Sequence, residues 1–136
     1  MNNREKGAFG EEEACKFLKK QGFRILARNF SLRGGEIDII GYRRRVLVFF
    51  EVKTRSSDAW GTPAEAIDEE KMNRVAFAAA GFRKMYCGNG KIDLPILFGI
   101  SVPRPVSASR IDGVEVYLTR EGSVREIRRI ENMREL

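Results

Sequence analysis

Apolar residues recur along this chain at the spacings of helices and strands, and these spacings predict the order of its elements. Helical spacing from Gly7 to Lys20, with Gly22 as a stop signal, predicts a first helix. Alternation over Phe23 to Phe30 predicts a first strand. Two further strands are expected at Gly35 to Gly41 and Val46 to Arg55, and a short turn between them would make an antiparallel hairpin.

The second half of the chain has a less uniform pattern. A second helix is expected from Ala64 to Tyr86, then a strand from Leu94 to Val102 and another from Val114 to Leu118. The segment Pro103 to Ser109 between those strands has the composition of a mobile loop. The last segment, Val124 to Leu136, fits either a helix or a hairpin strand.

Acidic residues stand in the two central strands. Because strand side chains alternate between faces, Glu36 and Asp38 are expected on one face of their strand, with Ile37 and Ile39 on the other. The next strand begins with an apolar run typical of burial on both faces, where a carboxylate is normally too costly. The hairpin would nevertheless bring Glu51 opposite Asp38, and two carboxylates at such positions indicate a functional site.

Two carboxylates at facing positions of neighbouring strands repel each other unless a cation lies between them. The chain has no histidine and only two cysteines, so oxygen ligands and a hard ion, Mg²⁺ or Mn²⁺, are expected. Lys53 shares the face of Glu51 and could neutralise developing negative charge. Carboxylates, a lysine and a metal suit phosphodiester hydrolysis.

Glu11 is a further candidate, because it shares the inward stripe of the first helix with Ala14, Cys15 and Leu18. An acid on a core-facing stripe needs a partner, and we expect the metal site or Lys53 to supply it. The alternative is an acid near a helix N-terminus that is favoured by the helix dipole.

Composition limits the class of protein. With 136 residues the chain fits one domain, 1–136, and 43% hydrophobic with 32% charged residues is typical of a folded globular protein. Its apolar stretches are too short for a bilayer span and it opens without a signal-peptide core, so a cytoplasmic protein with no membrane partner is expected. A net charge of +6 favours a polyanionic partner such as nucleic acid.

The order of Asp38, Glu51 and Lys53 resembles the PD-(D/E)xK nuclease superfamily. Additional segments narrow the resemblance to the YraN-type family of small bacterial proteins: Gly10-Glu11, Arg28-Asn29, Gly35 to Asp38, Phe50 to Arg55, Gly61 and Lys71. The resemblance implies an α/β fold with a restriction-endonuclease-like core, in which helices flank a mixed central sheet in the order helix, three strands, helix, strand and further strands. It also favours a strand as far as Ile130.

Two positions depart from the superfamily pattern. Ile37 stands where the superfamily name has proline, and Leu97-Phe98-Gly99 stands where relatives often carry an Arg-Phe-Asp run in the late strand.

In the leading hypothesis the protein is a metal-dependent nuclease acting on DNA, including structured or branched DNA. Asp38 and Glu51 would bind the ion, Glu11 would complete the site, Glu36 would be an outer ligand and Lys53 would orient water or stabilise charge. Residues expected to contact phosphates are Arg28, Arg33, Arg55 and Lys71, although surface ion pairs are an equally good interpretation of each.

Two alternatives remain open from the sequence. One is a nucleic-acid-binding module that retains the nuclease fold without cutting. The other is a structural charge cluster in which Lys53 neutralises Glu51 and Asp38. Symmetric cutting of two strands would need a homodimer, for which Val46 to Phe50 and the C-terminal segment offer apolar surface.

Overall fold

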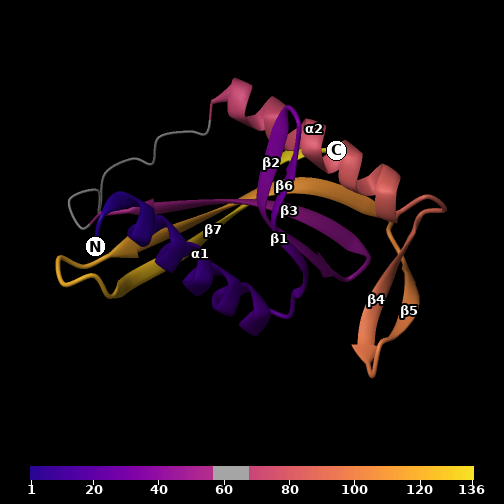
Figure 1. The fold of residues 1–136 in the computed structure, drawn as a ribbon, viewed down its shortest axis with the longest axis horizontal. Coiled ribbons are helices and arrows are strands. Elements are labelled where there is room, and N and C mark those ends of the chain that lie inside the picture. Colours follow the sequence, from indigo (N-terminus) through magenta and orange to yellow (C-terminus); the bar gives the residue numbers. More distant parts are fainter. Residues whose placement is uncertain (57–67) are drawn as a thin grey trace.

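A mixed five-stranded sheet forms the centre of the protein, with one helix on each face (Figure 1). The structure, a computed structural model, describes residues 1–56 and 68–136. Its elements are α1 (Asn3–Lys20), β1 (Arg24–Leu32), β2 (Gly35–Arg43), β3 (Val46–Arg55), α2 (Glu69–Tyr86), β4 (Lys91–Leu97), β5 (Ile100–Pro105), β6 (Ala108–Leu118) and β7 (Val124–Glu135). The predicted mixed α/β fold and element order are confirmed.

The strand order in the sheet is β1-β2-β3-β6-β7, and β3 with β6 is the parallel pair. Leu47 and Phe49 of β3 pack in the core under α2, whereas Val48 and Phe50 pack in the core under α1. All four side chains are fully buried. The prediction of a strand buried on both faces is confirmed, but the expected use of Val46 to Phe50 as a dimer surface is wrong, because the two helices cover this strand.

Helix α1 begins earlier than the expected Gly7. Asn2 caps it by accepting a hydrogen bond from Glu5 N at 2.8 Å, and the Glu5 side chain accepts in return from the backbone of Asn2. This capping box satisfies backbone N–H groups that have no partner within the helix. Four polar or charged residues precede Gly7 in the helix, so periodicity of apolar residues could not detect its first turn.

Helix α2 begins at Glu69, not at the predicted Ala64. Asp68 is the N-cap, and its carboxylate accepts a hydrogen bond from Lys71 N at 2.7 Å. The cap places Lys71 in the first turn of the helix, facing the sheet. The other residues expected at the start of this helix, 64–67, lie outside the described residues.

The predicted strand from Leu94 to Val102 is wrong, because the chain reverses within it. Phe98 and Gly99 form a two-residue turn with φ values of +51° and +74°, and β4 and β5 on either side pair as an antiparallel hairpin. The hairpin projects from the end of the main sheet (Figure 1). Positive φ at both central residues matches the twist of a two-residue hairpin.

The predicted loop from Pro103 to Ser109 is wrong at both ends, because β5 continues to Pro105 and β6 starts at Ala108. The late strand of the core is therefore β6, of which the predicted Val114 to Leu118 is only the second half. Its first half contains Arg110-Ile111-Asp112, so an Arg-x-Asp run is present in this strand, and not at Leu97-Phe98-Gly99. The C-terminal segment pairs with β6 as β7, which confirms the strand alternative.

One expected alternation is also wrong. Ile37 packs in the core under α2 and Ile39 in the core under α1, although both were expected on one face. The two residues pair with Phe30 and Arg28 of β1, and between those partners Asn29 takes the left-handed conformation, φ +52°. Asp38 lies between Ile37 and Ile39, so Asn29 is the β1 residue beside it, while the register shift of this ladder falls between Ile25 and Ala27.

Candidate functional site

Asp38 and Glu51 come together where β2 and β3 separate. The last pair of this ladder is Ile39 with Phe50, and continuing the register by one position sets Asp38 opposite Glu51. Asp38 Oδ2 accepts a hydrogen bond from Val52 N at 2.8 Å, so the carboxylate is anchored to the neighbouring strand. The alternation of faces breaks on either side of Asp38, with Ile37 in the core under α2 and Ile39 in the core under α1.

The Glu51 side chain is almost completely inside the protein. Its residue exposure is 6%, and Glu51 Oε2 is buried with no hydrogen-bond donor in the described part of the chain. Burial, with the neighbouring Asp38 adding to it, raises the pKa of Glu51 to about 7. Burial also raises the pKa of Asp38, opposed by the hydrogen bond from Val52. The pair therefore favours a bound proton or cation at neutral pH.

Lys71 supplies the amine beside this pair. Its Nζ lies 3.4 Å from Glu51 Oε1 and 3.5 Å from Glu36 Oε1. Burial lowers the pKa of Lys71, but Glu51, Glu36 and Asp38 outweigh that effect and raise it. Lys71 was expected to contact phosphate, and the structure instead joins it to two of the predicted metal ligands. Glu36 is 53% exposed at its side chain and reaches outward to Lys71.

Lys53 lies two residues after Glu51 in β3, on the face that β3 turns toward α2. It is partly buried, and within residues 1–56 and 68–136 it forms no ion pair. In the parallel ladder its partner position is Glu115, whose Oε2 is occupied by Arg55 Nε at 2.6 Å. Lys53 is thus an ammonium group two residues along β3 from Glu51, without an acid of its own among the described residues.

Glu11 approaches the site from α1. Its Oε1 lies 3.5 Å from Arg28 Nη2, so the partner in the structure is Arg28 and the expected pairing with Lys53 is wrong. Burial, followed by the charge of Asp38, raises the pKa of Glu11. Gly10 explains how the helix comes so close: a Cβ atom there would collide with the side chain of Thr54 in β3.

A hollow of about 370 Å³ opens on the α1 side of the carboxylates. Residues that line it include Glu11, Asp38, Val52, Thr54 and Arg55. Asp38 is the member of the pair that lines this hollow, whereas Glu51 does not line it.

The four predicted metal ligands do not form a single cluster. In the described part of the chain, no group of three or more acidic, histidine or cysteine side chains converges as a metal site. Among the described residues, Asp38 and Glu51 fit the role best, because Glu51 Oε2 has no hydrogen-bond donor there and Mg²⁺ is usually bound by one or two carboxylates, with water and substrate oxygens as the remaining ligands.

The cations predicted to contact phosphates are mostly engaged. Arg28 Nη1 lies 2.7 Å from Glu12 Oε2, Arg55 pairs with Glu115, and Lys71 pairs with Glu51 and Glu36. Arg33 is exposed in the turn between β1 and β2. The surface-ion-pair interpretation of Arg28 agrees with the structure, whereas the pairs of Arg55 and Lys71 are largely buried.

Sequence reasoning missed a second charged cluster, around Asp112 of β6. This residue is fully buried and accepts hydrogen bonds from Arg110 Nε at 2.9 Å and from Asn132 N at 2.8 Å; Arg129 Nη1 lies 3.4 Å away. The pattern Arg110-Ile111-Asp112 was the available signal. These contacts join β7 to β6, so the cluster is structural.

Neither helix described here combines the length and apolar character that crossing a bilayer requires.

Comparison with known proteins identifies relatives of this chain. The profile of the uncharacterised protein family UPF0102 matches residues 10–116. A UPF0102 protein of Caldicellulosiruptor saccharolyticus is 38% identical over 97% of this chain and 98% of its own length. One of Desulforamulus reducens is 36% identical over 93% and 92%, and one of Alkaliphilus oremlandii is 52% identical over 54% and 62%. The match confirms the YraN-type resemblance, and the chain belongs to the UPF0102 family.

Proposed function

We propose that this protein is a Mg²⁺- or Mn²⁺-dependent nuclease that hydrolyses phosphodiester bonds of DNA in the cytoplasm. The observation that carries the proposal is the pair Asp38 and Glu51: both carboxyls have a raised pKa, Asp38 lines an open hollow, and Glu51 Oε2 is buried with no hydrogen-bond donor among the described residues. Acidic residues that have shifted pKa values and lie together at a cleft are typical of functional sites.

Asp38 and Glu51 would hold the ion, since they are the two carboxylates whose oxygens converge. When bound, the ion supplies charge neutralisation at a phosphoryl oxygen and a more acidic water. Asp38 is held in place by Val52 N, and Glu51 by Lys71, so neither carboxylate needs to be ordered when substrate arrives.

Lys53 would stabilise negative charge on the phosphate that develops during the reaction. Its ammonium lies on the same face of β3 as Glu51 and forms no ion pair among the described residues, so its charge is available to an anion bound beside Glu51. Lys71 has a different role in this proposal. It keeps Glu51 oriented and offsets part of the repulsion between the two carboxylates.

Glu11 would support the site from α1, and Glu36 would act at its rim through Lys71. The net charge of +6 supports a polyanionic substrate, because clustering of acids at the site leaves the remaining surface more basic than the net value.

One observation favours a second candidate, a nucleic-acid-binding module that does not cut. Lys71 already neutralises Glu51, and three acids do not converge in the described part of the chain. A purely structural charge cluster is less well supported, because a self-sufficient cluster would satisfy Glu51 Oε2.

The test is incubation of duplex, single-stranded and four-way-junction DNA with Mg²⁺ or Mn²⁺. The proposal expects cleavage by the wild type and none by Asp38→Asn, Glu51→Gln or Lys53→Met. Glu131→Gln, which changes an exposed carboxylate on β7, is the control and should cut normally. DNA binding without any cleavage would favour the binding module, and equal cutting by all variants would reveal a contaminating enzyme.

A further inference from the structure

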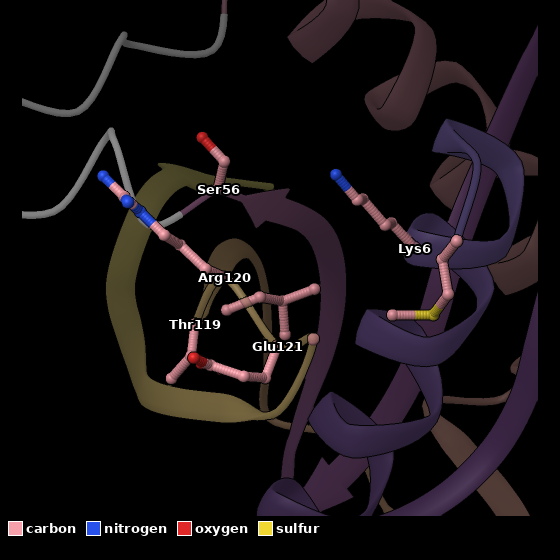
Figure 2. A pocket seen from close by; sticks show the side chains of 8 residues that line it. Lys6, Ser56, Thr119, Arg120 and Glu121 are labelled. Carbon is pink, nitrogen blue, oxygen red and sulfur yellow. The ribbon is translucent and has the colours of Figure 1, made fainter.

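Two cations near the site have not been assigned a role. Lys6 lies in α1, and Arg120 lies in the turn between β6 and β7. Both line a hollow of about 410 Å³ together with Met1, Ser56, Leu118, Thr119, Glu121 and Gly122. We refer to this space as the Lys6–Arg120 hollow (Figure 2). In that view the Lys6 ammonium and the Ser56 hydroxyl reach into the same open space, and the Arg120 guanidinium lies beyond Ser56.

The Lys6–Arg120 hollow adjoins the hollow at the carboxylates. Lys6 and Ser56 line both, and the second also contains Glu11 and Asp38. Ser56 follows the end of β3, four residues beyond Val52, whose N–H binds Asp38. At about 3.3 Å per strand residue, this corresponds to roughly 13 Å. A nucleic-acid strand carries a phosphate about every 3.4 Å along the axis, so this length spans only a few nucleotides.

Neither Lys6 nor Arg120 forms an ion pair with any residue in the described ranges. Glu121 lines the same hollow without pairing with either of them, whereas Arg28, Arg55 and Lys71, the predicted phosphate ligands, each form an ion pair. A cation without a partner keeps its full attraction for an incoming phosphate.

Rigid elements present both side chains. Lys6 is in the first turns of α1, and its N–H bonds Asn2 O at 3.0 Å within the capped end of the helix. The turn that carries Arg120 is closed by Thr119 N to Ser123 O at 2.8 Å and by a hydroxyl contact between Thr119 and Ser123 at 2.8 Å. Preorganised donors lose less conformational freedom on binding.

We propose that Lys6 and Arg120 bind a backbone phosphate of the nucleic-acid strand whose reacting phosphate lies at Asp38 and Glu51. The strand would run from the carboxylates past Ser56, whose hydroxyl can donate to a phosphate oxygen, to the β6–β7 turn. This inference rests on the proposed function, and it adds the direction in which the bound strand extends from the site across the surface of the protein.

The test is fluorescence anisotropy of a labelled single strand and its duplex, in EDTA so that binding is separated from cleavage. Lys6→Gln combined with Arg120→Gln should weaken binding about tenfold and reduce the salt slope of the affinity by about one to two. The matched control is Lys16→Gln with Arg104→Gln, which removes the same charge from exposed positions outside both hollows. Its effect should be at least threefold smaller.

Lys6→Arg with Arg120→Lys is the conservative variant, and it should retain wild-type binding if charge at these positions is what matters. Equal losses of affinity in the double variant and its control would overturn the inference, because the overall positive charge of the protein would then explain both losses. Wild-type affinity in the double variant would overturn it as well, while cleavage by the wild type would leave the proposed function intact.

Absence of DNA binding and cleavage in the wild type would overturn the inference and the proposed function together. Titration with inorganic phosphate and with a mononucleotide distinguishes the source of the phosphate. Micromolar binding of either one, lost in Lys6→Gln with Arg120→Gln, would assign the pair to a free ligand and overturn the backbone proposal.

Discussion

The ammonium nitrogen of Lys71 lies 3.4 Å from Oε1 of Glu51, which joins the first turn of α2 to the buried centre of the sheet. Lys71→Met would leave the Glu51 carboxylate buried without its cation. We expect a loss of about 2 kcal/mol in the free energy of unfolding at pH 8, measured by urea denaturation. At pH 5 the loss should be smaller, because Glu51 is then protonated.

The control for Lys71 is Glu36→Gln, which removes the other, mostly exposed partner. An exposed ion pair contributes about 0–1 kcal/mol, so this change should be nearly neutral. A large loss in Glu36→Gln, or an equal loss in Lys71→Met at both pH values, would show that Glu51 is not the group that Lys71 stabilises.

The pKa of Glu51 gives the protein a specific pH dependence. Because burial and Asp38 raise this pKa from 4.5 to about 7, the folded state binds a proton that the unfolded state has released. The contribution of this proton to the free energy of unfolding is fully present below pH 4.5 and is lost as the pH rises through about 7. This contribution is at most roughly 3 kcal/mol.

Glu51→Gln should therefore flatten the decline in stability between pH 5 and 8, and it should make the protein more stable than wild type at pH 8. The absence of histidine helps this measurement, because no imidazole titrates in the same range. The raised pKa values of Asp38 and Glu11 leave part of the decline in place. An unchanged slope in urea denaturation would contradict the assignment.

A divalent ion should stabilise the folded protein by binding the ionised pair. We expect Mn²⁺ to raise Tm by several degrees at pH 8, because an ion at 100 times its Kd adds about 2.7 kcal/mol. At pH 5 the rise should be much smaller, since Glu51 then holds a proton and offers the ion no charged ligand. Asp38→Asn should abolish the rise, while Glu131→Gln keeps it. Differential scanning calorimetry measures the change in Tm. An equal rise in Asp38→Asn would show that the ion binds at a site that does not include Asp38.

Two glycines of α1 should respond to alanine in opposite directions. A Cβ at Gly10 would collide with Thr54, so Gly10→Ala should destabilise the protein by about 1–3 kcal/mol. At Gly7 no atom lies within 4 Å of the added Cβ, so Gly7→Ala should stabilise by up to about 1 kcal/mol through helix propensity. Urea denaturation of both variants decides this, and stabilisation by Gly10→Ala would mean that α1 lies farther from β3.

The β4–β5 hairpin contains a conformation that its side chain does not favour. Phe98 has φ +51° and is 91% exposed, so its ring gains little from burial. Phe98→Asn would place the preferred Asn-Gly pair in the turn and should stabilise the protein by about 1 kcal/mol. Leu97→Asn, at the exposed neighbouring position, should bring no gain. Thermal denaturation compares the two, and equal effects would exclude relief of backbone strain.

Local pattern was sufficient for the carboxylate pair. Two strands joined by a short turn, which the structure closes with Arg44 and Arg45 at positive φ, bring Asp38 opposite Glu51 through the register of the hairpin, although the alternation of faces fails beside Asp38. The apolar run of β3 likewise predicted burial on both faces, because only a central strand can bury consecutive side chains. The inward position of Glu11 followed from helical spacing.

Contacts between distant segments could not be read from local pattern. Nothing in the sequence around Lys71 or Arg28 indicates that the first pairs with Glu51 and the second with Glu11. Helix α2 was also expected to begin at residue 64, which would have set Lys71 in a later turn. The left-handed conformation of Asn29 beside Asp38 and the hydrogen bond from Val52 N to Asp38 also have no local signal in the sequence.

The sequence by itself thus determined the order of elements in the first half, the central strand and the two carboxylates that meet across it, since each of these depends on residues close together in the chain. The tertiary structure decided which cation faces which acid among the described residues, because that choice depends on how helices and strands far apart in sequence pack together. It also decided that β6, and not the segment around Phe98, lies beside β3. A parallel pair is joined by a long connection, and no local signal specifies its register.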